Sequence, residues 1–409
     1  MHLILILDGF GYDVVKNFKQ AGGFKGFHGP SAVVAPYPSM TDLCVQDLVR
    51  GEPCTALEAR YFDRKANRVK GGMLAYLMGQ NQPYRTKLDW RAASWLDAVC
   101  YIAPWLAFKL ELRGLKSRFF STSREVFVGY LVTTAGIGTK YGTAGQNICL
   151  GYIEDFCADI MEARPGLRIT LVSDHGHGYV RSYPYDIRQE LRNLGWNPNS
   201  RLEKDNDVVY PAFGLVHCAG FYTKQPERLA KDLAQLACAE LVTYKTGDKV
   251  VILTKGKRAY VWPSSSKHAR ERGNPPLDPS FCWDDDDCRF TYLNVNGDPL
   301  ELELTEGSEL EMTNNEWLNK SLMHRYPCAP QRLWRAHTDL VQNTPDVILA
   351  LKNGYVFGSK LLSIFAHVES THGGLNRSNS LAFRLDTRHL PEYIVTSREA
   401  LAPSPVSSP

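Results

Sequence analysis

Three short runs of apolar residues constrain the fold of this chain more than any other feature. Residues 3–7, 126–132 and 168–173 are rich in Val, Ile and Leu and have the length of β-strands. Strands that are buried on both faces have nearly continuous apolar sequences, and they are typical of the centre of a parallel sheet. We therefore predict that the three runs are central strands of one sheet.

A helix is predicted between the second and third runs. Ile148, Tyr152, Phe156 and Ile160 recur at steps of four, which would place them on one apolar face of a helix over residues 146–163. The order strand, helix, strand implies a parallel pair of strands with a right-handed crossover. The expected fold class is thus α/β, with a mostly parallel sheet and helices on both faces.

The character of the sequence changes after the third run. Residues 213–222 are strand-like, a helical stripe passes through Leu229, and two further strand-like stretches cover 250–253 and 259–262. This pattern predicts a small α/β cap, over residues 182–316, that is inserted into the main domain.

The rest of the chain is assigned to the main domain. The main sheet is expected to resume near residues 346–351, so the core would comprise residues 1–181 and 317–400. The tail over residues 401–409 is rich in Pro and Ser, and we expect it to be disordered.

Composition and charge exclude several classes of protein. The 409 residues are 44% hydrophobic, and 47 basic side chains against 44 acidic ones leave a formal charge of +3. Over the whole chain, this balance argues against disorder and against a nucleic-acid polymer or an anionic membrane as partner. No apolar run reaches the roughly 18 residues of a bilayer span, and the N-terminus lacks a signal-peptide pattern, so we expect a cytoplasmic protein. The ten cysteines form no Cys-x-x-Cys pair and are expected to be free thiols.

Polar residues follow two of the predicted central strands. Asp8 comes directly after the first run, and residues 173–178 (Ser-Asp-His-Gly-His-Gly) end the third. Open α/β sheets place their ligand sites at the carboxyl ends of the strands, so Asp8 and Asp174 are expected to converge. A third motif, Pro-Ser-Met-Thr-Asp at residues 38–42, precedes a predicted helix over 42–49, whose N-terminal amides would suit a phosphate.

Together, in this order, the motifs resemble those of the alkaline phosphatase superfamily, including its type I phosphodiesterases and nucleotide pyrophosphatases. A fourth match is Ser-Thr-His-Gly-Gly-Leu at residues 370–375. The resemblance implies an alkaline-phosphatase-like three-layer sandwich with a mostly parallel central sheet and an inserted α/β cap. It also implies a set of metal ligands, a nucleophile and a further histidine with a catalytic or ligand role. The implied ligands are Asp8, Thr41, Asp174, His175 and His372, with Thr41 as the nucleophile and His372 as the further histidine.

The residue types suit the implied chemistry. Carboxylate oxygens and an imidazole hold a divalent zinc or manganese ion, and the ion would lower the pKa of the Thr41 hydroxyl so that it can attack phosphorus. Ser39 is the rival nucleophile, because members of the superfamily differ in where the hydroxyl lies relative to the proline. Thr41 is preferred because Pro-Ser-x-Thr resembles the subgroup, including phosphonoacetate hydrolases, in which the threonine attacks.

The pattern departs from that of two-metal relatives. Their Asp-x-x-Gly-His motif, which belongs to the second metal, corresponds here to residues 135–139, with Ala135 for the aspartate and Thr139 for the histidine. Neither side chain is a good metal ligand. The chain then resembles lipoteichoic acid synthases in using one ion, and His372, His177 or Lys140 would bind phosphate oxygens or protonate the leaving group.

The expected function is metal-dependent hydrolysis or transfer at a small-molecule phosphodiester or phosphomonoester, through a covalent phospho-threonine intermediate. Substrate choice is expected to lie with the cap and with the aromatic-rich stretch 90–120. The alternative is a catalytically inactive pseudoenzyme that binds a phosphorylated ligand or a metal. The sequence does not separate hydrolysis from phosphotransfer, and it leaves the oligomeric state open.

Overall fold

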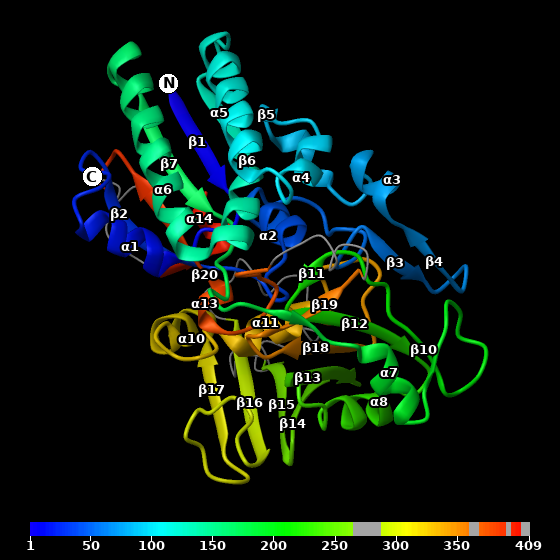
Figure 1. Ribbon diagram of the computed structural model, residues 1–409. Coiled ribbons are helices and arrows are strands. Elements are labelled where there is room, and N and C mark those ends of the chain that lie inside the picture. Colours follow the sequence, from blue (N-terminus) through cyan, green and yellow to red (C-terminus); the bar gives the residue numbers. More distant parts are fainter. Residues whose placement is uncertain (265–287, 360–367, 390–393, 402–409) are drawn as a thin grey trace, which may run out of the picture.

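The computed structural model describes residues 1–264, 288–359, 368–389 and 394–401. Within these residues the chain forms a seven-stranded and a nine-stranded sheet, together with two smaller sheets. Figure 1 shows the seven-stranded sheet and its long helices above the nine-stranded sheet. Apart from Leu401, the tail that we predicted to be disordered lies outside the described residues.

The seven-stranded sheet contains all three apolar runs. In spatial order its strands are β21 (Ile394–Thr396), β2 (His28–Val34), β20 (Leu381–Asp386), β7 (Arg168–Ser173), β1 (His2–Leu7), β6 (Val126–Leu131) and β5 (Trp90–Arg91). β1 pairs in parallel with both β6 and β7, while β20 is antiparallel to β7 and to β2. The predicted parallel centre is therefore confirmed, and one edge of the sheet is mixed.

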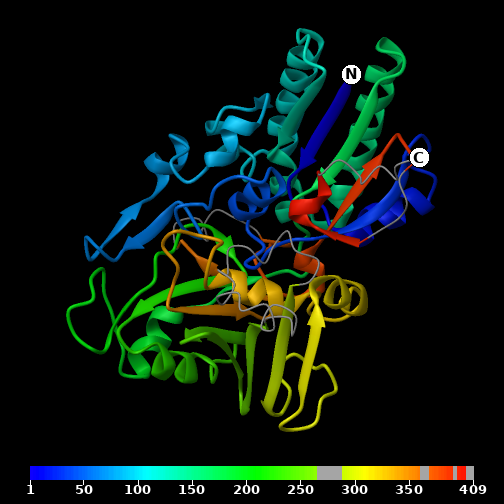
Figure 2. The ribbon, with the colours of Figure 1, turned by 180° about the vertical axis from the view of Figure 1, so that it is seen from behind.

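Helices cover both faces of this sheet. On one face Leu3 and Leu5 pack into a core shared with α1 (Tyr12–Gln20), α5 (Pro104–Phe120) and α6 (Thr133–Ala163). On the other face Ile6 packs with residues of α2 (Thr41–Leu48) and α14 (Ser397–Ala400). The two long helices α5 and α6 flank β1 both in Figure 1 and from behind, in Figure 2. The predicted α/β class with three layers is confirmed.

The apolar stripe that we predicted on α6 is partly wrong. Phe156 and Ile160 are buried, but Ile148 and Tyr152 are 58% and 40% exposed. The helix has a kink at Gly142, whose φ of 56° is not helical. The buried face advances by alternating steps of four and three rather than by four alone, because a helix has 3.6 residues per turn. Its members beyond the kink include Gln146, Cys149, Ile153, Phe156, Cys157 and Ile160.

The nine-stranded sheet contains the strands that we predicted for the cap. In spatial order they are β17 (Glu309–Thr313), β16 (Arg289–Asn296), β15 (Lys257–Ser264), β14 (Lys249–Thr254), β13 (Ala239–Thr246), β18 (Val347–Leu351), β12 (Cys218–Thr223), β10 (Asp207–Val209) and β9 (Asn197–Pro198). The predicted helix is α8 (Pro226–Leu233), which buries Leu229 and Leu233.

One expectation for this part of the chain is wrong. Residues 346–351 were expected to resume the main sheet, but β18 lies inside the nine-stranded sheet, antiparallel to β12 and β13. All five residues of β18 are buried. An apolar strand fits any sheet that is covered on both faces, so its sequence does not reveal which sheet it joins.

The remaining elements are short. The helices are α3 (Met73–Leu77), η1 (Pro83–Lys87), α4 (Trp95–Val99), α7 (Ile187–Asn193), α10 (Asn314–Ser321), α11 (Ala329–Ala336) and α13 (Arg377–Ser380). The strands are β3 (Arg60–Asp63), β4 (Arg68–Gly71), β8 (Tyr183–Pro184), β11 (Leu215–Val216) and β19 (Tyr355–Gly358). The nine cysteines among the described residues are buried thiols, as expected, and Cys282 lies outside them. In the described part of the chain no helix combines the length and the apolarity that a bilayer crossing needs.

Candidate metal centre

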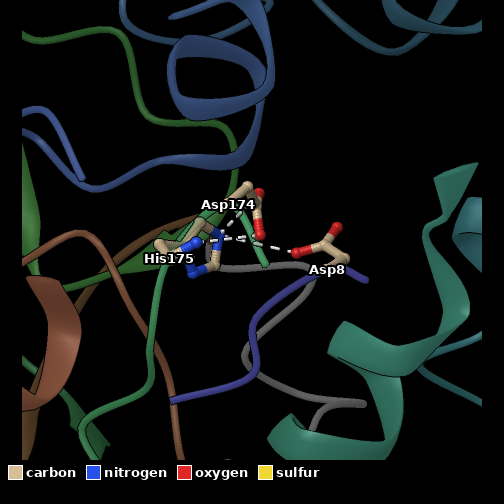
Figure 3. Close-up of side chains that lie close together, drawn as sticks. All are labelled: Asp8, Asp174 and His175. Atoms are coloured by element: carbon tan, nitrogen blue, oxygen red, sulfur yellow. Dashed lines mark hydrogen bonds and ion pairs between the residues drawn. The ribbon is translucent and has the colours of Figure 1, made fainter. Parts of the chain in front are cut away.

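Two neighbouring parallel strands bring the two predicted aspartates together. β1 and β7 are in register so that Leu7 lies opposite Ser173, and each is followed directly by an aspartate, Asp8 and Asp174. His175 comes next on the second strand. Figure 3 shows the three side chains pointing toward one another, and each is at least 99% buried. The predicted convergence at the carboxyl end of the sheet is therefore present.

The ligand atoms of these residues surround one point. The Nε2 atom of His175 is 3.5 Å from Oδ1 of Asp8 and 3.4 Å from Oδ2 of Asp174. One ligand atom from each of the three residues lies within 4.8 Å of the other two. Nδ1 of His175 donates to the carbonyl of Gly176 at 2.8 Å, so the neutral ring leaves its Nε2 lone pair directed at the carboxylates.

The electrostatics of this group call for a cation. Oδ1 of Asp174 accepts the backbone N–H groups of Gly9 and His175 at 3.0 and 2.9 Å, whereas its Oδ2 is buried without a hydrogen-bond partner. Burial raises the pKa of Asp174 to about 7, and burial beside Asp174 raises the pKa of Asp8 well above its usual value. Two buried carboxylates and an imidazole lone pair in mutual contact fit a divalent metal ion, which would supply the missing positive charge.

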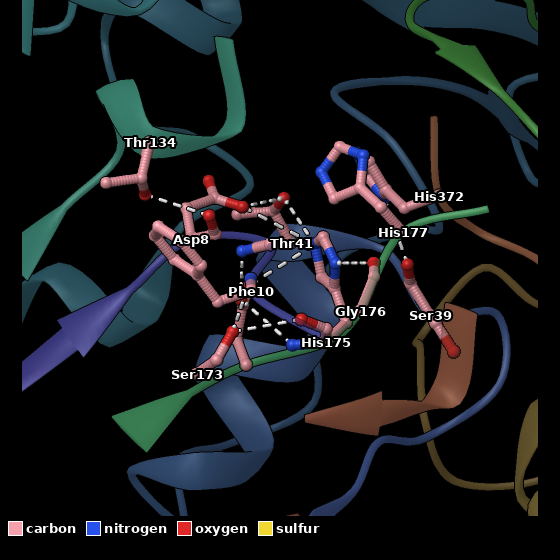
Figure 4. A network of polar contacts seen from close by, with 12 residues as sticks. Asp8, Phe10, Ser39, Thr41, Thr134, Ser173, His175, Gly176, His177 and His372 are labelled. Carbon is pink, nitrogen blue, oxygen red and sulfur yellow. Dashed lines mark hydrogen bonds and ion pairs between the residues drawn. The ribbon is translucent and has the colours of Figure 1, made fainter. Parts of the chain in front are cut away.

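Thr41 lies next to this group of three side chains. It is the first residue of α2, and its Oγ1 is 3.3 Å from Oδ1 of Asp8 and 3.1 Å from Nε2 of His175. Figure 4 shows the hydroxyl between these two side chains. Because Thr41 begins the helix, the hydroxyl stands beside backbone N–H groups that have no partner within the helix and can bind an anion.

Ser39 has a different environment from Thr41. Its side chain is fully buried, its Oγ donates to the carbonyl of Pro36 at 3.0 Å, and Arg332 donates to the same oxygen at 3.2 Å. The backbone carbonyl of Ser39 accepts a hydrogen bond from Nδ1 of His372 at 3.0 Å. Ser39 thus links the loop before α2 to Arg332 and His372. Its hydroxyl already takes part in two hydrogen bonds.

The ring of His372 stacks on the ring of His175. The ring centroids are 4.2 Å apart and the planes differ by 19°. Burial and the nearby His175 lower the pKa of His372 to about 3, so the ring is neutral at pH 7. Its Nδ1 proton is used in the hydrogen bond to Ser39, and its Nε2 atom therefore carries a lone pair. The structure places His372 beside the group of three ligands rather than within it.

His177 is packed against the backbone of the first motif. Its Nδ1 is 3.1 Å from Oγ of Ser370, and its Nε2 is buried without a hydrogen-bond partner. A Cβ at Gly9 would lie 2.5 Å from this Nε2, and Gly9 has a φ of +74°. The glycine after Asp8 is therefore needed both for the backbone conformation and for the close approach of His177.

Ala135 and Thr139, which the sequence resemblance assigns to the positions of a second metal site, lie at the start of α6. Ala135 is buried, and the carbonyl of Thr139 accepts the N–H groups of Glu369 and Ser370 at 2.9 and 3.2 Å. The amine of Lys140 donates to the carbonyl of Ile102 at 2.9 Å and is not available to the metal centre in this arrangement. Among the described residues, one group only combines three potential metal ligands.

Two supporting residues were not found by sequence reasoning. Tyr130 donates to Oδ2 of Asp8 at 2.6 Å from inside the apolar strand β6, where a tyrosine is easily taken for a core residue. Arg332 is buried on α11, donates to Ser39 and to Ser380, and has its pKa lowered to about 10 by burial. An arginine in an amphipathic helix gives no sequence signal for such a role.

Comparison with known proteins gives a likeness of overall structure only. No protein-family model and no curated protein sequence matches the chain. Among solved structures, it is similar to murine ectonucleotide pyrophosphatase/phosphodiesterase 5, with a TM-score of 0.47 and 9% identity over 97% of this chain and 92% of that one. The human protein of the same name gives a TM-score of 0.47 and 12% identity over the same shares.

Proposed function

We propose that this protein is a one-metal member of the alkaline phosphatase superfamily that hydrolyses or transfers a small-molecule phosphoester through a phospho-threonine intermediate. The observation that carries the proposal is the position of Thr41. Its hydroxyl lies within 3.3 Å of Asp8 and 3.1 Å of His175, at the first residue of a helix and at the edge of a buried group of metal ligands. A nucleophile, a cation site and an anion site therefore coincide.

Asp8, Asp174 and His175 would hold the ion, with Thr41 as the fourth ligand. A divalent zinc or manganese ion bound there would lower the pKa of the Thr41 hydroxyl and neutralise charge on the phosphate. Oγ1 of Thr41 forms a bond to phosphorus, its proton is lost to solvent, and the ester P–O bond breaks as the leaving group takes up a proton. Water or a second acceptor would then attack phosphorus and lose a proton, the bond between phosphorus and Oγ1 of Thr41 would break, and Oγ1 would take up a proton to restore the hydroxyl.

His372 is proposed to act in the second step. Its Nδ1 proton is held by the carbonyl of Ser39, which leaves the lone pair on Nε2. This nitrogen is therefore the atom of His372 that could accept a proton from the attacking water. Protonation of the leaving group is left to solvent in this scheme.

Thr41 is favoured over Ser39 as the nucleophile on contacts and exposure. The Ser39 hydroxyl is buried, donates to a backbone carbonyl and accepts from Arg332. Thr41 is half-buried and touches the ligand side chains directly. A serine that first had to break two hydrogen bonds would be a poorer nucleophile.

A second candidate function is supported by the residues at the start of α6. Ala135 and Thr139 offer no ligand for a second ion, and a chain with this deficit could retain the fold and bind a phosphorylated ligand or a metal without turnover. The two candidates share the site and differ in whether Thr41 is phosphorylated during a reaction.

The test is made on the full chain after removal of metals with EDTA. Native mass spectrometry before and after addition of manganese or zinc counts the bound ions, and bis(p-nitrophenyl) phosphate and p-nitrophenyl phosphate report diesterase and monoesterase turnover. We expect one tightly bound ion, turnover of at least one ester, and a phosphorylated peptide that contains Thr41 in a rapid acid quench. One bound ion without turnover of any ester in a broad panel would favour the pseudoenzyme, and two ions would show that other residues complete a second site.

A further inference from the structure

An exposed apolar surface lies on α5 and on the adjoining part of α6. Ile102, just before α5, is 72% exposed, Leu106 is 59% exposed, and Ile148 on α6 is 58% exposed. We define the α5–α6 face by its apolar residues and the cations beside them. Its members are Ile102, Trp105, Leu106, Lys109, Leu110, Arg113, Lys140, Tyr141, Ile148 and Tyr152. Figure 1 shows the two helices beside each other on the seven-stranded sheet.

Ring contacts join these residues into one surface across the two helices. The ring centroid of Trp105 is 6.0 Å from that of Tyr141, in a stacked arrangement, and 6.1 Å from that of Tyr152. The amine of Lys109 lies 5.5 Å from the centroid of the Tyr152 ring, and that of Lys140 lies 6.0 Å from the Tyr141 ring. Five members of the face, Trp105, Lys109, Lys140, Tyr141 and Tyr152, are thus joined in one cluster across the two helices.

The charge of the face has one sign. α5 carries four basic residues, and its only acidic residue, Glu111, is buried and accepts the N–H groups of Val132 and Thr133. On α6 the acidic side chains begin only at Glu154, beyond Tyr152. The four basic residues of α5 are Lys109, Arg113, Lys116 and Arg118. One of them, Lys116, is paired with Asp159 at the far end of the helices.

We propose that the α5–α6 face binds the surface of an anionic lipid bilayer. Amphipathic Trp and Tyr rings, flanked by exposed aliphatic side chains and by Lys and Arg, are the composition of interfacial membrane contacts. The cations would pair with lipid phosphate and carboxylate groups, while Ile102 and Leu106 enter the boundary between headgroups and acyl chains.

Charge favours a lipid surface over a protein partner. Lysine is depleted at the centres of protein–protein interfaces, yet Lys109 and Lys140 lie among the aromatic rings of this face. The proposal does not depend on the proposed catalytic activity.

The experiment is co-sedimentation of the full chain with vesicles, in buffer with EDTA. Vesicles of phosphatidylcholine that contain phosphatidylserine are compared with vesicles of phosphatidylcholine alone, at low and at high salt. Two variants test the face, Lys109→Gln with Arg113→Gln for charge, and Leu106→Ser with Leu110→Ser for apolar contact. Lys204→Gln with Met323→Ser is the matched control, because it removes an exposed cation and a 76% exposed apolar side chain elsewhere.

The wild type and the control are expected to bind the anionic vesicles, with binding weakened by salt. The charge variant should lose about tenfold or more in partition coefficient, since each basic residue near an anionic surface strengthens binding about fivefold. The apolar variant should lose binding at both salt concentrations. All four substituted side chains are exposed, and thermal unfolding curves that match the wild type would show that folding is intact.

Three outcomes would overturn the proposal. One is a wild type that does not bind anionic vesicles, and another is binding that the charge and apolar variants leave unchanged. The third is a dimer in light scattering that Leu106→Ser dissociates while vesicle binding is absent, which would assign the face to a second copy of the chain.

Discussion

Two regions at the same edge of the seven-stranded sheet have opposite chemistry. After β1 and β7 come Asp8, Asp174 and His175, which converge on one point. After β6, the neighbour of β1 on its other side, the chain enters α6 with residues 133–139, whose side chains are small, apolar or hydroxylic. A carboxylate after β6 would stand beside the same site, but the sequence has Ala135 there.

The start of α6 is used for packing instead. Thr134 donates to the carbonyl of Asp8 at 2.8 Å, Thr133 is bound to Glu111, and a Cβ at Gly136 would lie 2.3 Å from the carbonyl of Cys100. Here the buried carboxyl of Glu111 accepts hydrogen bonds from Val132 and Thr133. After β1 and β7, two buried carboxylates adjoin an imidazole, and Oδ2 of Asp174 has no hydrogen-bond partner. Of these two regions, the strand ends after β1 and β7 are therefore the one suited to a cation.

The largest effect is expected from removing the hydroxyl of Thr41, the proposed nucleophile beside Asp8 and His175. Thr41→Ala should lower turnover of the responsive ester by on the order of 10³-fold or more, because the hydroxyl that it removes contacts both Asp8 and His175 and is the proposed nucleophile. Initial rates with the ion added measure the effect, and native mass spectrometry checks that an ion still binds. Thr41→Ser, which retains a hydroxyl, is the matched control and should keep part of the activity. Undiminished turnover in Thr41→Ala would move the nucleophile to Ser39.

The second prediction concerns the ion. Asp174→Ala removes the carboxylate whose Oδ2 has no hydrogen-bond partner, and it should weaken manganese or zinc binding by on the order of 10²-fold or more. Titration calorimetry on EDTA-treated protein measures the affinity. Asp159→Asn, on the exposed end of α6, is the control and should leave the affinity unchanged. Equal affinities in the two variants would mean that the ion binds elsewhere.

The third prediction concerns the start of α6, where two substitutions would introduce side chains that bind metal ions. Ala135→Asp with Thr139→His supplies two further ligands at the start of α6, and it should raise the number of bound ions from one to two in native mass spectrometry. Both positions are buried, so the single variants serve as controls for folding and should bind one ion each. A double variant that folds and still binds one ion would show that positions 135 and 139 do not correspond to the second site of two-metal relatives.

The sequence predicted the centre of the main sheet because buried parallel strands have a strong signal. Asp8 and Asp174 were located from the ends of those strands, and their convergence follows from the register of β1 and β7. The same signal misplaced β18, since a strand of five buried residues fits either sheet. The stripe on α6 failed at Ile148 and Tyr152 because apolar spacing alone cannot distinguish a face toward the core from an exposed apolar face.

Contacts between distant segments could not be predicted from the sequence. Tyr130 reaches Asp8 from a neighbouring strand, and Arg332 reaches Ser39 from 293 residues along the chain. Tyr130 lies in an apolar strand and Arg332 in an amphipathic helix, and neither sequence pattern indicates a role for its polar side chain. Such partners are determined by packing in three dimensions, and one sequence carries no local signal for them.

The last prediction, with the smallest expected effect, concerns how the stability of the metal-free protein depends on pH through Asp174. Burial raises the pKa of Asp174 to about 7, well above that of an unfolded aspartate, so the folded metal-free protein holds this proton more tightly than the unfolded chain. Its contribution to stability is therefore fully present below about pH 4 and is lost as the pH rises to about 7, with a slope of at most about 1.4 kcal/mol per pH unit. Asp174→Asn has no proton to lose and should show a shallower slope.

Urea unfolding in EDTA at pH 5, 6 and 7 measures this slope. It should not vanish in Asp174→Asn, because burial also raises the pKa of Glu58 and Glu111 to about 7, and both remain. Asp159→Asn, which alters an exposed carboxyl, should keep the wild-type slope. In the wild type, added manganese or zinc should reverse the trend, because the ion displaces the proton from Asp174 and binds more tightly as the pH rises. Equal slopes in wild type and Asp174→Asn would show that burial does not raise the pKa of Asp174 in the metal-free protein.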